Sequence, residues 1–156
     1  MKFSKREDVE ASIDAVFRAV SDFPAFERAA LRRGVEVSRR DEMETIGPGM
    51  SWAARAPIRG RLRDVAIRVA DWQPDTSLTL SADSSGVLGT LQVELVALSR
   101  QRTRMLVALE LRAATMGSKL LLQSMKLTKG SLDKRFARRI ADFAAEIAAR
   151  QHRPGK

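Results

Sequence analysis

Side chains suited to nucleophilic or acid–base chemistry are scarce in this chain of 156 residues. It contains no cysteine and no tyrosine, and its one histidine, His152, lies close to the C-terminus. A Ser-His-Asp triad, a multi-histidine metal site, a thiolate zinc site and a disulfide are therefore excluded. We interpret His152 as part of a solvated tail, because disorder concentrates at chain termini. We expect no metal site and no cofactor.

The remaining chemical candidates are carboxylates and guanidinium groups. Asp64 and Arg68 lie four residues apart in a segment of alternating character, so both would share one face of a strand. If that face points inward, the pair could hold a ligand as a polar handle. If it points outward, the two form an ion pair that contributes about 0–1 kcal/mol. Acid–base catalysis would require these residues, or Glu94 and Glu110, to face an internal cavity.

The charge of the chain is strongly basic. It carries 28 lysines and arginines against 19 acidic residues, a formal net charge of +9. Such a balance favours attraction to polyanions but does not indicate a fold. No helix-turn-helix, finger or RNA-recognition signature accompanies the basic runs, so we do not expect nucleic acid as a partner. Two alternatives stay open: a merely solvated basic surface, or an anionic membrane surface attracted by residues such as Arg59, Arg61 and Arg63.

No targeting or membrane-spanning segment is evident. Residues 1–12 lack an apolar stretch of signal-peptide length, and no window approaches the roughly 18 apolar residues of a membrane span. We therefore predict a cytoplasmic protein with one domain over residues 1–151 and a disordered tail over 152–156. The sequence does not indicate an oligomeric state.

The N-terminal third predicts a strand followed by two short helices. Residues 2–11 alternate, and Ser12 is suited to cap a helix whose apolar residues recur at helical spacing: Ile13, Val16, Phe17 and Val20. Pro24 can open a second helix, and Gly34 can end it.

The middle of the chain predicts successive antiparallel strands. From residue 35 to about 113 the apolar residues alternate, and turn sequences such as "GPGM", "QPDT" and "SSG" separate the segments. In the segment 61–72, Leu62 and Trp72 have the opposite parity to Val65, Ile67 and Val69, which indicates a bulge.

Helical periodicity returns for residues 118–150. The predicted stripe consists of Leu121, Met125, Thr128, Leu132, Phe136, Ile140, Phe143 and Ile147. A helix of about 30 residues would span on the order of 45 Å, enough to cross a sheet. Residues 120–127 are apolar on several sides, and Gly130 either allows a bend, leaves room for a ligand or packs closely against a strand. One such helix on a bent sheet is a two-layer α+β architecture.

This order of elements resembles the START and birch-pollen-allergen-like superfamily, also called SRPBCC. The clearest local match is "IDAVFRAVSDFPAFER", which contains Val16, Phe17, Val20, Ser21, Asp22 and Pro24. The resemblance implies the helix-grip fold, with about seven antiparallel strands curved around a long C-terminal helix and an internal cavity between them. Members bind lipids, sterols, quinones, polyketides or plant hormones, and some are aromatases, cyclases or hydrolases. The superfamily has no transferable catalytic motif.

A cavity between sheet and helix would be lined by apolar side chains from both layers. The strand candidates are Met50, Trp52, Leu91, Val93, Met105, Val107 and Leu109, and the helix candidates are Leu121, Met125, Leu132 and Phe136. For each of them, ordinary core packing is the alternative. We therefore predict binding or carriage of a small hydrophobic or amphipathic ligand, such as a lipid, quinone or polyketide. A polyketide cyclase/aromatase-like enzyme and a module that binds RNA or an anionic membrane are the alternatives.

Overall fold

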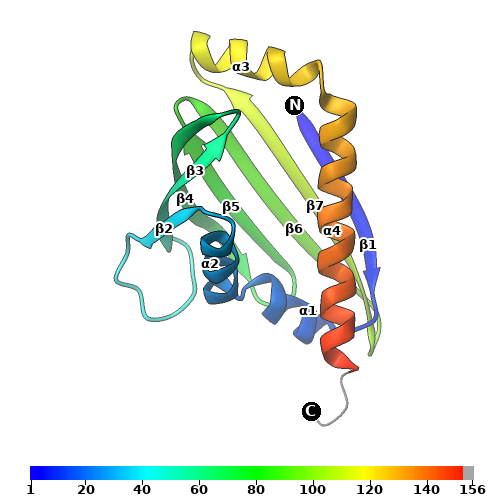
Figure 1. The fold of residues 1–156 in the computed structure, drawn as a ribbon. Coiled ribbons are helices and arrows are strands. Elements are labelled where there is room, and N and C mark those ends of the chain that lie inside the picture. Colours follow the sequence, from blue (N-terminus) through cyan, green and yellow to red (C-terminus); the bar gives the residue numbers. More distant parts are fainter. Residues whose placement is uncertain (153–156) are drawn as a thin grey trace.

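Residues 1–152 are described by the computed structural model, which places seven strands and four helices in this part of the chain (Figure 1). Apart from His152, an exposed residue, the predicted disordered tail lies outside the described residues. The elements are β1 (Lys2–Val9), α1 (Ile13–Val20), α2 (Phe23–Arg32), β2 (Glu36–Arg39), β3 (Ser51–Ile58), β4 (Arg61–Gln73), β5 (Ser77–Ser84), β6 (Val87–Ser99), β7 (Arg102–Ala113), α3 (Met116–Lys126) and α4 (Lys129–Gln151).

All seven strands form one antiparallel sheet in the order β1-β7-β6-β5-β4-β3-β2. The sheet curves, α4 lies along β1, and α1 and α2 cross the end of the concave side (Figure 1). The predicted helix-grip arrangement, including the sheet of about seven strands and the two short helices after the first strand, is therefore confirmed. No helix in the described residues combines the length and hydropathy that crossing a bilayer requires.

Local capping signals explain the two short helices. The Ser12 hydroxyl accepts a hydrogen bond from the Ala15 N–H at 3.2 Å, as an N-cap does. Pro24 lies in the first turn of α2, and Gly34 follows that helix with φ of +80°, a conformation that glycine adopts without strain. The sequence predicted all three of these roles.

The bulge predicted in residues 61–72 is present between Val69 and Asp71 of β4, where the pairing with β5 shifts register. Because of this extra residue, Val69 and Trp72 can both face the interior despite their opposite parity. Val69 is fully buried, and the Trp72 ring packs against Phe17 with centroids 5.8 Å apart. Leu62 lies before the bulge and remains largely exposed at the β3–β4 turn.

The long C-terminal helix begins later than the sequence predicted. Residues 118–150 are not continuous, because α3 ends at Lys126 and α4 begins at Lys129, and the two run in different directions (Figure 1). At the break, the Thr128 hydroxyl donates to the Met125 carbonyl at 3.3 Å, a back-bond that tends to bend helices. Gly130 lies after the break, and a Cβ at this position would meet no atom within 4 Å beyond its chain neighbours and the backbone of its own helix. Close packing of Gly130 against a strand was therefore a wrong alternative.

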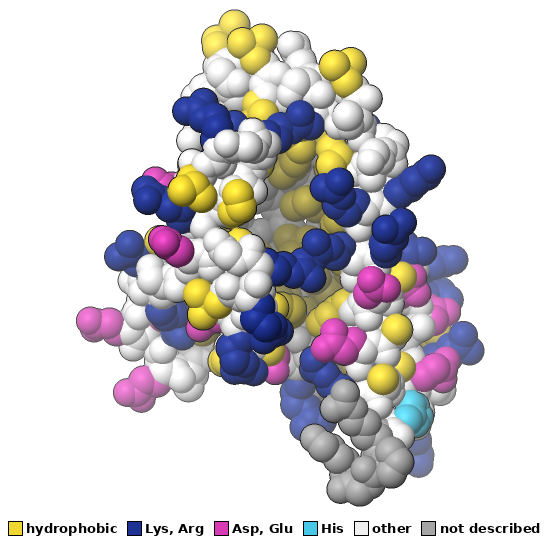
Figure 2. All heavy atoms as spheres, viewed as in Figure 1, with side chains coloured by type: hydrophobic (Ala, Val, Ile, Leu, Met, Phe, Trp, Pro, Cys, Tyr) yellow, Lys and Arg dark blue, Asp and Glu magenta, His cyan; other side chains and the backbone are white. Residues whose placement is uncertain are grey.

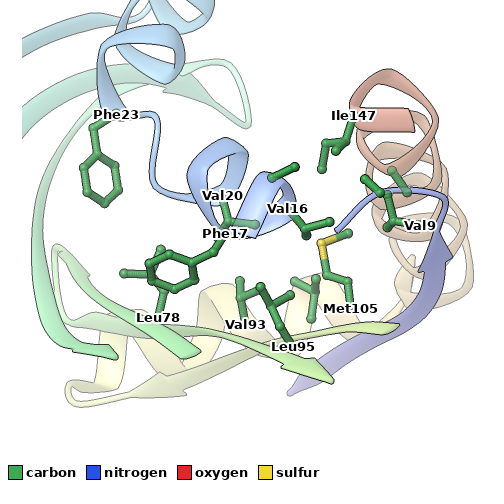
Figure 3. Close-up of a cluster of buried hydrophobic side chains, with 14 of the residues drawn as sticks. Val9, Val16, Phe17, Val20, Phe23, Leu78, Val93, Leu95, Met105 and Ile147 are labelled. Carbon is green, nitrogen blue, oxygen red and sulfur yellow. The ribbon is translucent and has the colours of Figure 1, made fainter. Parts of the chain in front are cut away.

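The hydrophobic core lies where α1 and the C-terminal half of α4 meet the sheet. In Figure 3, Val16, Phe17 and Val20 of α1 point toward strand residues that include Val93 and Met105. Ile147 of α4 closes the same cluster and is only 1% exposed. The core therefore fills one end of the concave side, and the space between α2, α4 and the middle of the sheet is not filled in the same way.

Candidate functional site

A pocket of about 690 Å³ lies between the sheet, α2 and α4. Figure 2 shows it as a hollow with hydrophobic side chains inside and lysine or arginine side chains around the opening. Its volume falls within the range of roughly 300–1,000 Å³ that small-molecule sites occupy.

The floor of the pocket is apolar and comes mainly from the strands. Alternation along each strand presents every second side chain to the concave side, so neighbouring strands build one continuous surface. The strand residues that line the pocket are Val37, Trp52, Ile67, Leu78, Leu80, Leu91, Val93, Met105 and Val107. Two of the helical walls are apolar as well: Ala25, Phe26, Ala29 and Ala30 come from α2, and Ile140 and Phe143 come from α4.

Trp52 is the best-anchored side chain of this floor. Its indole Nε1 donates a hydrogen bond to Glu27 Oε1 of α2 at 2.8 Å, and its ring packs on Phe23 with centroids 5.0 Å apart. These two contacts tie β3 to α2 and hold the indole in place. Glu27, although it lines the pocket, is thus already used by a structural hydrogen bond.

Arg39 also lies over the Trp52 ring. Its guanidinium carbon lies 5.8 Å from the Trp52 ring centroid, and its nitrogens donate to the Asp41 carboxylate at 2.6 and 2.7 Å. These hydrogen bonds from Arg39, and to a smaller extent the one from the Ser51 N–H, hold the pKa of Asp41 well below its usual range. Together with the Met43 N–H, which donates to Asp41 at 2.9 Å, these bonds fix the loop that precedes β3.

One contact joins the two helical walls of the pocket, and a second connects the β3–β4 turn to the residue before α4. Phe26 of α2 and Phe143 of α4, both lining residues, meet with ring centroids 5.8 Å apart. At the other end of α4, Arg59 in the β3–β4 turn donates to the Thr128 hydroxyl at 3.3 Å. Neither contact is extensive, because each consists of one pair of side chains that are at least partly exposed.

The rim of the pocket carries both acidic and basic side chains, and most of the acidic ones already have a hydrogen-bond or ion-pair partner. Among the lining carboxylates, Asp22 caps α2 through the Ala25 N–H at 3.2 Å, and Glu146 pairs with Arg150. By contrast, Arg32, Arg33 and Arg139 have no carboxylate within 4.0 Å among the described residues. Asp142 is the one lining carboxylate without a hydrogen bond or ion pair in the described part of the chain. Three uncommitted arginines against one uncommitted carboxylate make the uncommitted charge at the rim net positive.

The structure places the apolar candidates in two groups. Five of them, all from strands, line the pocket: Trp52, Leu91, Val93, Met105 and Val107. Six do not line it: Met50, Leu109, Leu121, Met125, Leu132 and Phe136. Met50 belongs to the buried core, and Phe136 packs on Phe3 with ring centroids 5.9 Å apart. Because the helix breaks before Thr128, Leu121 and Met125 lie on α3, away from the pocket. That any of these side chains contacts a ligand stays a prediction.

Asp64 and Arg68 point outward and do not form a polar handle in the pocket, but the expected ion pair between the two does not form either. The Asp64 side chain is 81% exposed and pairs with Arg55 at 3.1 Å, and Arg68 is exposed as well. The reason is the pleat of β4, which turns Val65, Ile67 and Val69 inward and the residues between them outward. Glu94 and Glu110 are exposed too, so none of the four residues required for acid–base catalysis faces the pocket.

Sequence reasoning missed the helical half of the site. Phe26, Ala29 and Ala30 of α2 follow helical spacing in the sequence, but nothing in the sequence indicates that this face borders a space instead of the core. Small alanine side chains on that face were the available signal, since they leave volume between helix and sheet. The rim residue Arg139 lies beside the apolar stripe of α4 and looked like an ordinary solvated charge.

Comparison with known proteins identifies the fold but not the family. No family model matches the sequence, and no curated protein matches it either. Solved structures do match over nearly the whole chain. The Zhui aromatase/cyclase from Streptomyces sp. R1128 is similar with a TM-score of 0.73 and 13% identity, covering 99% of this chain and 98% of that one.

Two further structures point to the same architecture. A point mutant of norcoclaurine synthase from Thalictrum flavum has a TM-score of 0.68 and 12% identity, covering 98% of this chain and 96% of the synthase. A START superfamily protein from Mycobacterium smegmatis has a TM-score of 0.55 and 18% identity, covering 86% and 95%. The chain thus has the helix-grip fold of the START and birch-pollen-allergen-like proteins.

Proposed function

We propose that this protein binds a small amphipathic molecule in the pocket between the sheet, α2 and α4. The observation that carries the proposal is the pocket itself, whose volume of about 690 Å³ is enclosed by a continuous apolar floor and two apolar helical walls. Transfer of the apolar part of a ligand from water to this surface would drive binding, at about 25 cal/mol per Å².

The rim supports an anionic polar end for this ligand. Three lining arginines, Arg32, Arg33 and Arg139, have no carboxylate partner among the described residues, whereas most lining carboxylates are already bound. A carboxylate or phosphate at the opening would accept charge-assisted hydrogen bonds from these guanidinium groups. A ligand with an apolar body and one anionic end therefore fits both the floor and the rim.

Binding fits the arrangement better than a cyclase reaction does. Similarity to an aromatase/cyclase supports the enzyme alternative, but at 13% identity it carries no residue roles. Catalysis would need a carboxylate or arginine that reaches the interior, and the strand candidates lie on the outer face. Of the four carboxylates at the pocket, Glu27 is engaged by Trp52, Asp22 by the start of α2 and Glu146 by Arg150. Asp142 is left, and it is exposed at the rim.

Calorimetric titration with dodecanoate and with dodecanol, its uncharged counterpart, tests the proposal. We expect dodecanoate to bind about tenfold more tightly, because only the carboxylate engages the rim arginines. Arg139→Gln should remove most of this preference, whereas Arg138→Gln, at an exposed neighbour outside the pocket, should leave it unchanged. Ala30→Phe should weaken both ligands by filling the pocket, with exposed Ala145→Phe as its control.

The preference for an anionic end and the use of the pocket as a binding site can be contradicted independently. Equal affinity for the acid and the alcohol would overturn the anionic preference and leave the apolar pocket standing. No binding of either molecule, or binding that Ala30→Phe does not weaken, would overturn the pocket as a binding site.

A further inference from the structure

One end of the molecule exposes more large apolar side chains than its fold requires. We define the α3 end as residues 57–63, the β3–β4 turn, together with residues 116–127, which are α3 and its C-cap. On α3, Met116, Leu120 and Leu127 are 75%, 65% and 87% exposed. Their spacing of four and seven residues places all three on one side of the helix. In the turn, Leu62 is 66% exposed and Ile58 is exposed as well.

This exposed side is not the face by which α3 is held in the fold. The helix packs on β7 through its opposite face, where Ser118 and Leu122 are buried. Thr115 and Ser118 form a capping box, with the Ser118 N–H donating to the Thr115 hydroxyl at 3.1 Å. α3 is thus capped and packed without its second apolar face, which is exposed among the described residues.

The charges of the α3 end are of one sign. Arg59, Arg61 and Arg63 lie in the turn, and Lys119 and Lys126 flank the apolar face of α3. Residues 57–63 contain no acidic side chain, and neither do residues 114–132. The partner of this surface must therefore be anionic and must also accept aliphatic side chains.

An anionic lipid bilayer meets both conditions, whereas a second copy of the chain and a nucleic acid do not. A second copy of the chain, paired through this surface, would bring the same cations together. A nucleic acid would leave the aliphatic side chains without a partner, and neither segment contains an aromatic residue for base stacking. We propose that the α3 end docks on membranes that contain anionic lipid, with α3 lying in the interface and its lysines at the headgroups.

The α3 end does not line the pocket, because the α4 residues of the lining begin at Arg139, eleven residues after Thr128. Arg59 of the turn reaches Thr128, between α3 and α4, and Figure 2 shows lysine and arginine side chains around the hollow below α3. The docking proposal itself does not depend on what the pocket binds.

Cosedimentation with phosphatidylcholine vesicles, with and without phosphatidylglycerol, tests the proposal. At low salt we expect binding only to the vesicles that contain phosphatidylglycerol. The double variant Leu120→Ser, Leu127→Ser should weaken binding at least about tenfold, because two apolar side chains no longer enter the interface. Arg59→Gln and Arg61→Gln should each weaken it about fivefold. All four positions are exposed, and unchanged thermal unfolding would show that the variants fold.

The β6–β7 turn offers a matched control. It lies at the opposite end of β7, about 40 Å from the start of α3 along the strand. Leu98 and Arg100 are exposed there, so Leu98→Ser with Arg100→Gln removes the same kinds of side chain. This control should bind vesicles like the unmodified protein.

Three results would overturn the proposal. The first is a lack of binding to the phosphatidylglycerol vesicles at low salt. The second is an equal loss of binding in the α3 variant and the β6–β7 control, which would indicate adsorption by overall charge. The third is a dimer in sedimentation velocity that the Leu120→Ser, Leu127→Ser variant dissociates, since a second copy would then cover this face.

Discussion

α3 and α4 are separated by only Leu127 and Thr128, yet they use their apolar residues in opposite ways. α4 directs Ala144 and Ile147 into the core, and its Ile140 and Phe143 line the pocket. α3 buries only Ser118 and Leu122 and leaves a second apolar side exposed. The contrast indicates that α4 stabilises the interior of the protein, whereas the exposed apolar side of α3 is available to a partner.

The largest effect expected from this contrast concerns stability. Ile147→Ala in α4 should lower the free energy of unfolding by about 2–5 kcal/mol, because the side chain is 1% exposed and its removal leaves a cavity. Leu127→Ala, next to α3, should change it by no more than about 0.5 kcal/mol, since this side chain is 87% exposed. Chemical denaturation of both variants measures the difference. Similar losses would contradict the assignment of separate roles to the two helices.

A smaller effect is expected at the junction of the helices. Gly130→Ala should stabilise the protein by about 0.4–1 kcal/mol, because the residue is helical and an added Cβ meets no atom within 4 Å. Gly86→Ala should have the opposite sign, since Gly86 has φ of +88° and its Cβ would lie 2.7 Å from the Thr115 hydroxyl. Thermal unfolding of the two variants checks both signs. Destabilisation by Gly130→Ala would mean that the junction requires glycine for a reason that its surroundings do not reveal.

Local signals made most of the fold predictable. The capping role of Ser12, the positions of Pro24 and Gly34, and the bulge near Val69 depend on residues close together in sequence. The helix break was not predictable in this way, because the apolar stripe continues through Thr128 without interruption. At the junction, Thr128 accepts a hydrogen bond from Arg59, which lies 69 residues earlier in the chain. The periodicity of a helix contains no information about such a distant partner.

The candidate site also has a part that was predictable from local sequence and a part that was not. Its strand half was predictable, because alternation alone places Trp52, Leu91 and Val93 on one face of the sheet. Its helical half was not, because the volume between α2 and the sheet depends on how far apart the two layers lie. The rim arginines were missed for a related reason: whether Arg139 is solvated or faces an opening depends on the placement of α2 opposite it.

Trp52 provides the most direct measurement of whether a ligand enters the pocket. Trp72, the other tryptophan, lies outside the pocket lining and donates to the Ser21 hydroxyl at 3.3 Å, so Trp72→Phe leaves Trp52 as the only reporter. Titration of this variant with a brominated long-chain carboxylate should quench Trp52 emission and reach saturation. Adding Ala30→Phe should shift that saturation to higher concentrations. Absence of quenching, or quenching that rises linearly and is unaffected by Ala30→Phe, would contradict ligand binding in the pocket.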